Sequence, residues 1–306
     1  MKVSIIGAGQ VGSTLAMRIV ESDLADVVLV DIFRNLALGK SLDILDAAPL
    51  IGHERTVIGT DDYADIRGSQ IVVITAGLPR KPGMSRDELS SKNCEVVKAV
   101  SGHIKAKAPD SIVIVVTNPL DAMTYLAYKT TAFKRYKVFG MAGELDGSRF
   151  KSIIANGLNV PRASVQTFIL GSHGDTMVPI LSNTSVNGKP ILSLLPKSRI
   201  DELVGKTRAR GAEIVSHLGT GSAYFSPSAA IFKMLRAVIK DTKETLTVSA
   251  YLDGEYGLKD IAIGVPCKLG RSGIEEIVEL KLSEEEKNAL AKSARAIKDS
   301  IAPLAI

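Results

Sequence analysis

The first half of this 306-residue chain alternates short runs of β-branched apolar residues with amphipathic stretches of helical period. Six runs predict strands, the last of them short: Val3 to Ile6, Val27 to Val30, Thr56 to Ile58, Ile71 to Thr75, Ile112 to Thr117 and Val138 to Phe139. The stretches Val11 to Glu21 and Ser85 to Lys107 predict helices between strands. Strands joined by helical crossovers form a parallel, doubly wound sheet that is buried on both faces. The pattern therefore predicts an α/β fold.

After about Gly143 the pattern changes to helices mixed with hairpin-like segments. The predicted helices are Leu145 to Gly157, Ile200 to Leu218, Phe225 to Lys240 and a capped C-terminal helix within Ser283 to Ala302. The pair Asn187-Gly188 is a hairpin turn signal, and the runs Val248 to Leu252 and Ile261 to Val265 predict antiparallel strands. We therefore expect two domains, a Rossmann-type domain over residues 1–143 and an α+β domain over residues 144–306.

Several classes of protein are excluded by composition. Hydrophobic residues make up 45% and charged residues 23% of the chain, which is typical of folded globular proteins and not of disordered ones. The longest aliphatic runs, such as Ile112 to Val116, are far too short to cross a bilayer, so no membrane association is expected. Glycines interrupt the apolar N-terminus before a signal peptide could form, so we expect the mature protein to start at Met1.

The two cysteines and the charge distribution narrow the field further. Cys94 and Cys267 form no C-x-x-C pair, which argues against a disulfide framework or a zinc site and favours a reducing cytoplasm. The formal charge is +5, but the basic residues are scattered and lack the interleaved aromatic residues that stack on bases. We expect no nucleic-acid partner, and a basic surface suited to small anions.

A glycine-rich segment marks the predicted cofactor site. The run Gly7-Ala8-Gly9-Gln10-Val11-Gly12 lies directly between the first strand and the first helix. In such a segment the first glycine permits a tight turn, the second lets the main chain approach a pyrophosphate, and the third lets helix and strand pack closely. The helix N-terminus then holds the phosphates. The segment predicts a dinucleotide site that includes Gly7, Gly9, Gln10, Val11 and Gly12.

The end of the second strand indicates which dinucleotide binds. Asp31 lies nineteen residues after Gly12, where a carboxylate accepts hydrogen bonds from the adenosine ribose. A carboxylate there repels a 2'-phosphate, so the sequence favours NAD over NADP. Arg34 is close enough in sequence to soften that preference.

One histidine has a sequence context that suits catalysis. The segment Gly171-Ser172-His173-Gly174-Asp175 follows a predicted strand, Val165 to Leu170. Asp146 and Arg149 are three residues apart on a predicted helix and share one face of it. The other histidines, His53, His103 and His217, match no catalytic motif, and no motif suggests a metal ion.

Taken together, these motifs resemble those of the malate and lactate dehydrogenase family, and within it those of the lactate-dehydrogenase-like malate dehydrogenases. Six segments in family order carry the resemblance: Gly7–Gly12, Ala76–Arg86, Thr117–Asp121, Leu145–Phe150, Gly171–Pro179 and Gly221–Tyr224. The resemblance implies that His173 carries the proton and that Asp146 orients it. It also implies that Arg149 binds the carboxylate next to the reacting carbon. By the same resemblance Asn118 contacts substrate and nicotinamide, and Asn93, Val116 and Thr117 line the cofactor.

The resemblance also concerns the substrate. It implies that Arg86 polarises the substrate carbonyl and that Arg80 selects the acid, because lactate dehydrogenases typically have glutamine at that position. Three arginines, Arg80, Arg86 and Arg149, would match a dicarboxylate such as malate or oxaloacetate better than pyruvate. Ala223, where lactate enzymes usually have threonine, agrees with this reading.

Alternatives stay open at this stage. The chain could act on lactate or another 2-hydroxy acid, or it could be a catalytically silent dinucleotide sensor, although the set His173, Asp146 and Arg149 argues against a sensor. The resemblance implies a homo-oligomer, with a tetramer favoured over a dimer, and a role in the tricarboxylic acid cycle.

Overall fold

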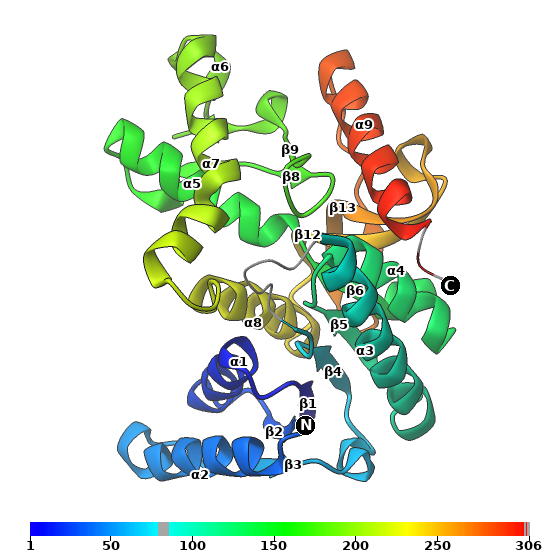
Figure 1. The fold of residues 1–306 in the computed structure, drawn as a ribbon. Coiled ribbons are helices and arrows are strands. Elements are labelled where there is room, and N and C mark those ends of the chain that lie inside the picture. The colour runs from blue at the N-terminus through cyan, green and yellow to red at the C-terminus, as the bar shows by residue number, and fades with distance from the viewer. Residues whose placement is uncertain (79–85, 303, 305–306) are drawn as a thin grey trace.

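A computed structural model describes residues 1–78, 86–302 and 304 of the chain. Among these residues, one nine-stranded sheet has the order β14-β13-β12-β6-β5-β4-β1-β2-β3 (Figure 1). Its parallel strands are β1 (Lys2–Ile6), β2 (Asp26–Val30), β3 (Val57–Thr60), β4 (Ile71–Ile74), β5 (Ile112–Val115) and β6 (Val138–Met141). The order 3-2-1-4-5-6 defines a Rossmann fold, so the predicted doubly wound sheet is confirmed.

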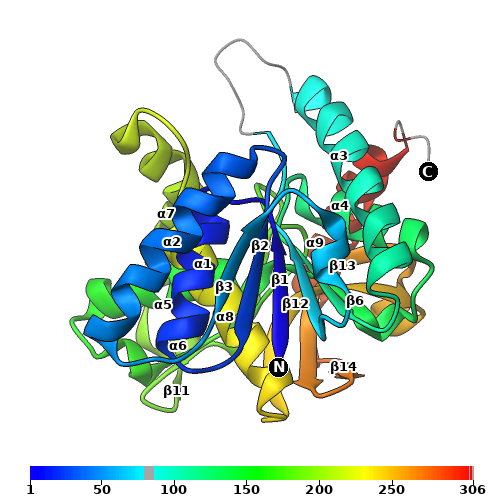
Figure 2. The ribbon, with the colours of Figure 1, turned by 90° about the horizontal axis from the view of Figure 1, so that it is seen from below.

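Helices cover both faces of the parallel strands (Figure 2). One face carries α1 (Gln10–Glu21), α2 (Arg34–Ile51) and α8 (Phe225–Ile239), and the other carries α3 (Arg86–Lys107) and α4 (Leu120–Thr131). Ile5 of β1 belongs to the same core cluster as Leu15 and Ile231. Its neighbour Ile6 belongs to the opposite cluster, with Val97. Successive strand residues thus feed two cores, which explains why the strands are continuous apolar runs.

The C-terminal half extends the same sheet in the antiparallel direction. The added strands are β12 (Glu244–Asp253), β13 (Lys259–Gly270) and β14 (Gly273–Ile277). The predicted pair is confirmed, because Val248 lies opposite Val265 in the register. Val248 also lies opposite Met141 of β6, so the antiparallel strands continue the Rossmann sheet and build no separate one.

Two small sheets correct one prediction. The expected strand Val165 to Leu170 is wrong, because it is two short strands, β7 (Val165–Gln166) and β8 (Ile169–Leu170), that pair with different partners. Strand β7 pairs with β10 (Ser185–Val186), which also pairs with β11 (Lys189–Pro190), and β8 pairs with β9 (Val178–Pro179). The predicted turn is confirmed, since Asn187 and Gly188 have φ values of +51° and +76° between antiparallel strands.

The remaining elements surround the C-terminal half. The helices are α5 (Gly143–Leu158), α6 (Ile191–Leu194), α7 (Lys197–Leu218) and α9 (Glu284–Ile301). Single 3-10 turns occur at Tyr63–Ile66, Arg135–Lys137, Arg162–Ser164, Leu181–Asn183 and Glu255–Gly257. Helix α9 begins with a capping box between Ser283 and Glu286, as its sequence predicts. None of the described helices is long and apolar enough to span a membrane.

Candidate active site

The three glycines at the junction of β1 and α1 have three different geometries. Gly7 has a φ of +111°, and a Cβ there would lie 2.7 Å from the main-chain nitrogen of Ala76. A Cβ on Gly12 would lie 2.0 Å from the carbonyl oxygen of Gly7, so only glycine lets α1 approach β1 this closely. Around Gly9 no described atom lies within 4 Å of such a Cβ. The main chain at Gly9 is therefore open to a ligand, which fits a bound pyrophosphate.

Asp31 faces this loop from the end of β2. Its Oδ2 accepts a hydrogen bond of 2.7 Å from the Ala8 amide, and its Oδ1 accepts one of 2.9 Å from the Phe33 amide. Each carboxylate oxygen keeps a second lone pair, which a ribose hydroxyl could use. Gln10 and Val11 begin α1, where the first N–H groups of a helix have no partner within it. These features fit a dinucleotide whose phosphates lie at the helix N-terminus.

The side chain of Asn93 is buried and bonds to the main chain of two neighbouring segments. It is 2% exposed, its Oδ1 accepts from the Leu78 amide at 2.8 Å, and its Nδ2 donates to the Asn118 carbonyl at 2.8 Å. The Asn93 amide group thus joins the segment after β4 to the segment after β5. This bracing role gave no signal in the sequence, because both partners are main-chain atoms.

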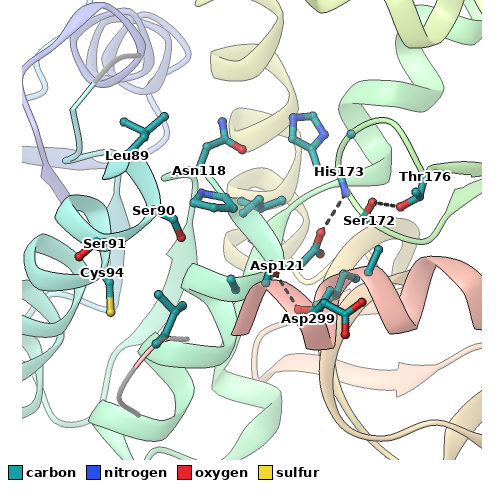
Figure 3. A pocket seen from close by; sticks show the side chains of 18 of the residues that line it. Leu89, Ser90, Ser91, Cys94, Asn118, Asp121, Ser172, His173, Thr176 and Asp299 are labelled. Atoms are coloured by element: carbon teal, nitrogen blue, oxygen red, sulfur yellow. Dashed lines mark hydrogen bonds between the residues drawn. The ribbon is translucent and has the colours of Figure 1, made fainter. Parts of the chain in front are cut away.

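The segment after β5 brings three of the predicted residues together. Val116 and Thr117 are buried, and Thr117 Oγ1 donates a hydrogen bond of 2.6 Å to the Ala76 carbonyl. Asn118 is exposed and points into the same cavity as His173 (Figure 3). Of the predicted residues, Asn118 is thus the one whose side-chain amide is available beside the histidine.

His173, Asp146 and Arg149 form one group, in which Asp146 is buried and the other two side chains are largely buried. His173 Nδ1 lies 2.8 Å from Asp146 Oδ2, and Arg149 Nη1 lies 3.3 Å from Asp146 Oδ1. Asp146 is in the first turn of α5, where the helix dipole stabilises a negative charge. Because a carboxylate only accepts, Nδ1 carries a proton and Nε2 is the nitrogen that can exchange one. The sequence prediction that Asp146 and Arg149 share a helix face is confirmed.

The surroundings of His173 favour its charged form. Burial by itself lowers the pKa of the imidazole, but Asp146, through its charge and its hydrogen bond, more than reverses this effect. Arg149 opposes the charged form and Asp121 supports it, and the net result is a raised pKa. A histidine with a raised pKa remains an available proton donor at higher pH than an ordinary one.

The guanidinium of Arg149 has an unused hydrogen-bond donor in the described structure. Its side chain is 14% exposed, and no described residue accepts a hydrogen bond from its buried Nε. Burial lowers the pKa of the guanidinium although Asp146 raises it. A buried and incompletely paired guanidinium suits a carboxylate ligand, which it can bind in a bidentate manner.

Sequence reasoning missed the residues that hold the His173 loop. Asp121 Oδ2 accepts from the His173 amide at 2.9 Å, and Asp121 Oδ1 accepts from Ser249 Oγ at 2.7 Å. Ser293 Oγ of α9 accepts from the Ser172 amide at 2.8 Å. Asp121 lies within one of the segments that carry the family resemblance, so its position was visible but its role was not.

A cavity of about 980 Å³ opens beside these residues (Figure 3). Helix α3, the segment after β5, the His173 loop and α9 line it. Its described lining includes Asn118 and His173 but neither the glycine loop nor Arg149, so it meets the predicted site at one side. Of the two predicted loop arginines, Arg80 lies outside the described residues, and Arg86 begins α3 at their edge. Among the described residues no cluster of three His, Cys, Asp or Glu side chains could hold a metal ion.

A Rossmann sheet with an open glycine loop, joined to a half with a hydrogen-bonded His–Asp pair, defines the class of NAD-dependent oxidoreductases. Two sequence profiles match the chain: the NAD binding domain of lactate/malate dehydrogenase over residues 1–140 and its alpha/beta C-terminal domain over residues 143–305. The chain therefore belongs to the lactate/malate dehydrogenase family, and the resemblance seen in the sequence is confirmed.

Individual relatives agree with this assignment. A malate dehydrogenase from Trichormus variabilis is 52% identical over 300 residues, which cover 98% of this chain and 93% of that protein. The solved malate dehydrogenase from Salinibacter ruber has a TM-score of 0.94 at 45% identity and covers 99% of this chain and 97% of its own. A lactate dehydrogenase from Cryptosporidium parvum, solved with lactic acid and β-nicotinamide adenine dinucleotide, has a TM-score of 0.96 at 40% identity, with coverages of 99% and 97%.

Proposed function

We propose that this enzyme is a malate dehydrogenase that interconverts (S)-malate and oxaloacetate with NAD. The observation that carries the proposal is the 2.8 Å contact between His173 Nδ1 and Asp146 Oδ2, next to the largely buried Arg149, whose Nε has no described hydrogen-bond partner. The malate dehydrogenases among its relatives support the choice of substrate.

The described residues divide the chemistry between them. Bound NAD supplies the hydride acceptor, and its reduced form supplies the donor. In the direction of oxaloacetate reduction, His173 Nε2 gives a proton to the oxygen that becomes the hydroxyl, while Asp146 holds the ring in the required tautomer. Arg149 binds the carboxylate next to the reacting carbon, and Asn118 donates to the substrate oxygen. In the reverse direction neutral His173 takes up the hydroxyl proton.

The choice between dicarboxylate and monocarboxylate rests on the arginines. We infer that Arg80 pairs with the distal carboxylate and that Arg86 polarises the carbonyl, so that three cations face a doubly charged substrate. The alternatives are a dehydrogenase for lactate or another 2-hydroxy acid, and a silent sensor. The intact His173–Asp146 contact argues against the sensor.

One assay separates these alternatives. The purified chain is mixed with NADH and either oxaloacetate or pyruvate, and NADH absorbance is followed. We expect rapid oxidation of NADH with oxaloacetate and slow oxidation with pyruvate. The reverse order would make the chain a lactate dehydrogenase, and no oxidation with either substrate would favour the sensor.

Asp31 should make NADH the better cofactor than NADPH, because its carboxylate repels a 2'-phosphate and cannot donate a hydrogen bond to it. Asp31→Asn keeps an acceptor for the Ala8 amide and removes the charge, so it should narrow the ratio of kcat/KM for NADH over that for NADPH. Arg34→Gln is the matched control. Arg34 forms only a long ion pair, with 3.9 Å between its Nε and Asp61 Oδ1 at an exposed site. Its replacement should lower kcat/KM for NADPH and leave kcat/KM for NADH unchanged. Equal efficiency of the wild-type chain with both cofactors would refute the role of Asp31.

We further propose that residues 1–143 bind the dinucleotide and that residues 144–306 bind the substrate carboxylate. We place the enzyme in the cytoplasm and in the tricarboxylic acid cycle.

We also propose that the chain works as a homo-oligomer, a tetramer rather than a dimer. Large exposed apolar side chains support self-association: Leu36, Leu42, Leu50 and Ile51 on α2, and Val215 and Leu218 on α7. Sedimentation equilibrium measures the mass directly, and a monomer alone at micromolar concentration would contradict the oligomer.

A further inference from the structure

The loop that carries His173 is held at three successive main-chain amides by three different elements. The Gly171 amide donates to the Gly264 carbonyl of β13 at 2.9 Å, and the Ser172 amide donates to Ser293 Oγ of α9 at 2.8 Å. The His173 amide donates to Asp121 Oδ2 of α4 at 2.9 Å (Figure 3). The imidazole therefore extends from a main chain that is fixed at His173 itself and at the two residues before it.

The third of these anchors differs from the other two because it is a carboxylate. Asp121 is 5% exposed, and its oxygens accept from two neutral donors, the His173 amide and the hydroxyl of Ser249. An amide side chain could bond to both partners, accepting from the His173 amide and donating to the Ser249 hydroxyl, without the cost of burying a charge. No Lys or Arg pairs with Asp121 in the described structure. The cation that can form next to it is the imidazolium of His173.

We propose that Asp121 is a positioning residue of the proton relay, which fixes the main chain of His173 and places a second carboxylate charge beside its imidazole. The proposal rests on the proposed function only in that the relay carries the proton. Through this hydrogen bond, α4 of the dinucleotide-binding half fixes the His173 loop of the other half. Ser249 of β12 orients the carboxylate by donating a hydrogen bond to its other oxygen, Oδ1.

The charges around the imidazole give the proposal a direction in pH. Asp146 and Asp121 favour the charged imidazole, Arg149 opposes it, and Asp175 and Asp299 line the same cavity. Burial raises the pKa of Asp121 to about 6, although Ser249, the His173 amide and the imidazole lower it. Above about pH 6 Asp121 is therefore charged and supports the imidazolium, and below it Asp121 takes up a proton and this support is lost.

The central experiment compares Asp121→Asn with the wild-type chain by two readouts. Asparagine can accept from the His173 amide and donate to Ser249, so it keeps the geometry and removes the charge. The first readout is the NMR titration of the imidazole, which is resolvable because the chain has four histidines and His173→Asn identifies the signal. We expect the midpoint of His173 to move to lower pH in Asp121→Asn.

The second readout is the pH profile of activity. Reduction of oxaloacetate needs the imidazolium, so Asp121→Asn should match the wild-type rate within a few-fold near pH 6 and fall below it by about tenfold near pH 8. Oxidation of malate needs the neutral ring, so its acid limb should move to lower pH. A residue with only a structural role would lower both directions equally at every pH.

Two further variants separate position from charge. Ser293→Ala removes the neighbouring anchor without changing a charge, and it should lower kcat without moving the His173 midpoint. Asp121→Ala removes both anchor and charge and should cost about 10²-fold in kcat at all pH values, the loss that a misplacement of about 1 Å causes. If Asp121→Ala does not fold, Asp121→Asn and Ser293→Ala still decide the question.

The outcomes are distinct. An unchanged His173 midpoint in Asp121→Asn would overturn the proposal, and so would an equal shift in Ser293→Ala. If the wild-type chain oxidised no NADH with any 2-oxo acid, the proposed function would fail, yet the NMR titration would still test the contact between Asp121 and His173. A shifted midpoint together with a shifted pH profile would support both.

Discussion

His173→Asn is expected to reduce turnover with oxaloacetate by about 10² to 10⁴-fold, the range that general acid–base groups contribute. Asparagine keeps the main-chain bond to Asp121 and a polar side chain toward Asp146, but it has no proton to exchange near neutral pH. Steady-state kinetics with NADH at saturating oxaloacetate measure the loss. The dissociation constant of NADH, measured by fluorescence titration, should change little, because the glycine loop lies on other elements.

The control for this variant is His217→Asn. His217 is exposed in the last turn of α7, and no hydrogen bond or ion pair joins it to His173, Asp146 or Arg149 in the described structure, so its replacement should leave both turnover and NADH binding unchanged. Turnover of His173→Asn within a few-fold of wild type, with NADH still bound, would show that another group carries the proton.

The dinucleotide half could be predicted from the sequence because its determinants are local. The separate roles of Gly7, Gly9 and Gly12 follow from main-chain geometry within six consecutive residues, and the structure has the positive φ, the open space and the close approach that they imply. Apart from the edge strand β3, in which Ile58 is exposed, the parallel strands are buried on both faces, so each appears as a short apolar run that can be recognised without its neighbours.

Elements whose pattern is mixed were not predicted. Helix α2 has no single apolar stripe, because Leu42 and Leu50 are exposed while Ala37 and Ile44 are buried. Helix α4 is buried on nearly all sides and has no polar face for periodicity to detect. The strand predicted over Val165 to Leu170 divides because its halves pair with different strands, and pairing partners are not encoded in a run of six residues.

The site shows the same limit. His173, Asp146 and Arg149 could be proposed from motifs, and the structure brings them together within 3.3 Å contacts. The role of Asp121 could not, since its partners lie 52 and 128 residues away along the chain and one of them is a main-chain amide. Contacts of this kind depend on the packing of α4 against the catalytic loop and β12, which only the folded chain shows.

Arg80→Gln is expected to change the substrate preference of the enzyme more than any other single substitution. If Arg80 pairs with the distal carboxylate of oxaloacetate, glutamine leaves that carboxylate desolvated without a cationic partner. Truncating one member of such a charge pair costs about 2 to 5 kcal/mol, which is roughly 30-fold to several-thousand-fold in kcat/KM. Pyruvate has no second carboxylate and loses nothing comparable, so activity on pyruvate should hold or rise.

Steady-state kinetics on both substrates, with NADH saturating, measure the two effects separately. Lys81→Gln is the matched control, because it removes a cation from the next position of the chain, and it should change the ratio of the two kcat/KM values little. A fall of at least tenfold on oxaloacetate in Arg80→Gln alone would support a direct contact with the distal carboxylate. Equal losses on oxaloacetate and pyruvate would mean that Arg80 supports the conformation of its segment and does not read the substrate. Arg86 and Arg149 could not then provide the selection, because the carboxylate and the carbonyl that they are proposed to contact occur in both substrates, and the monocarboxylate would have to be excluded by the shape of the cavity.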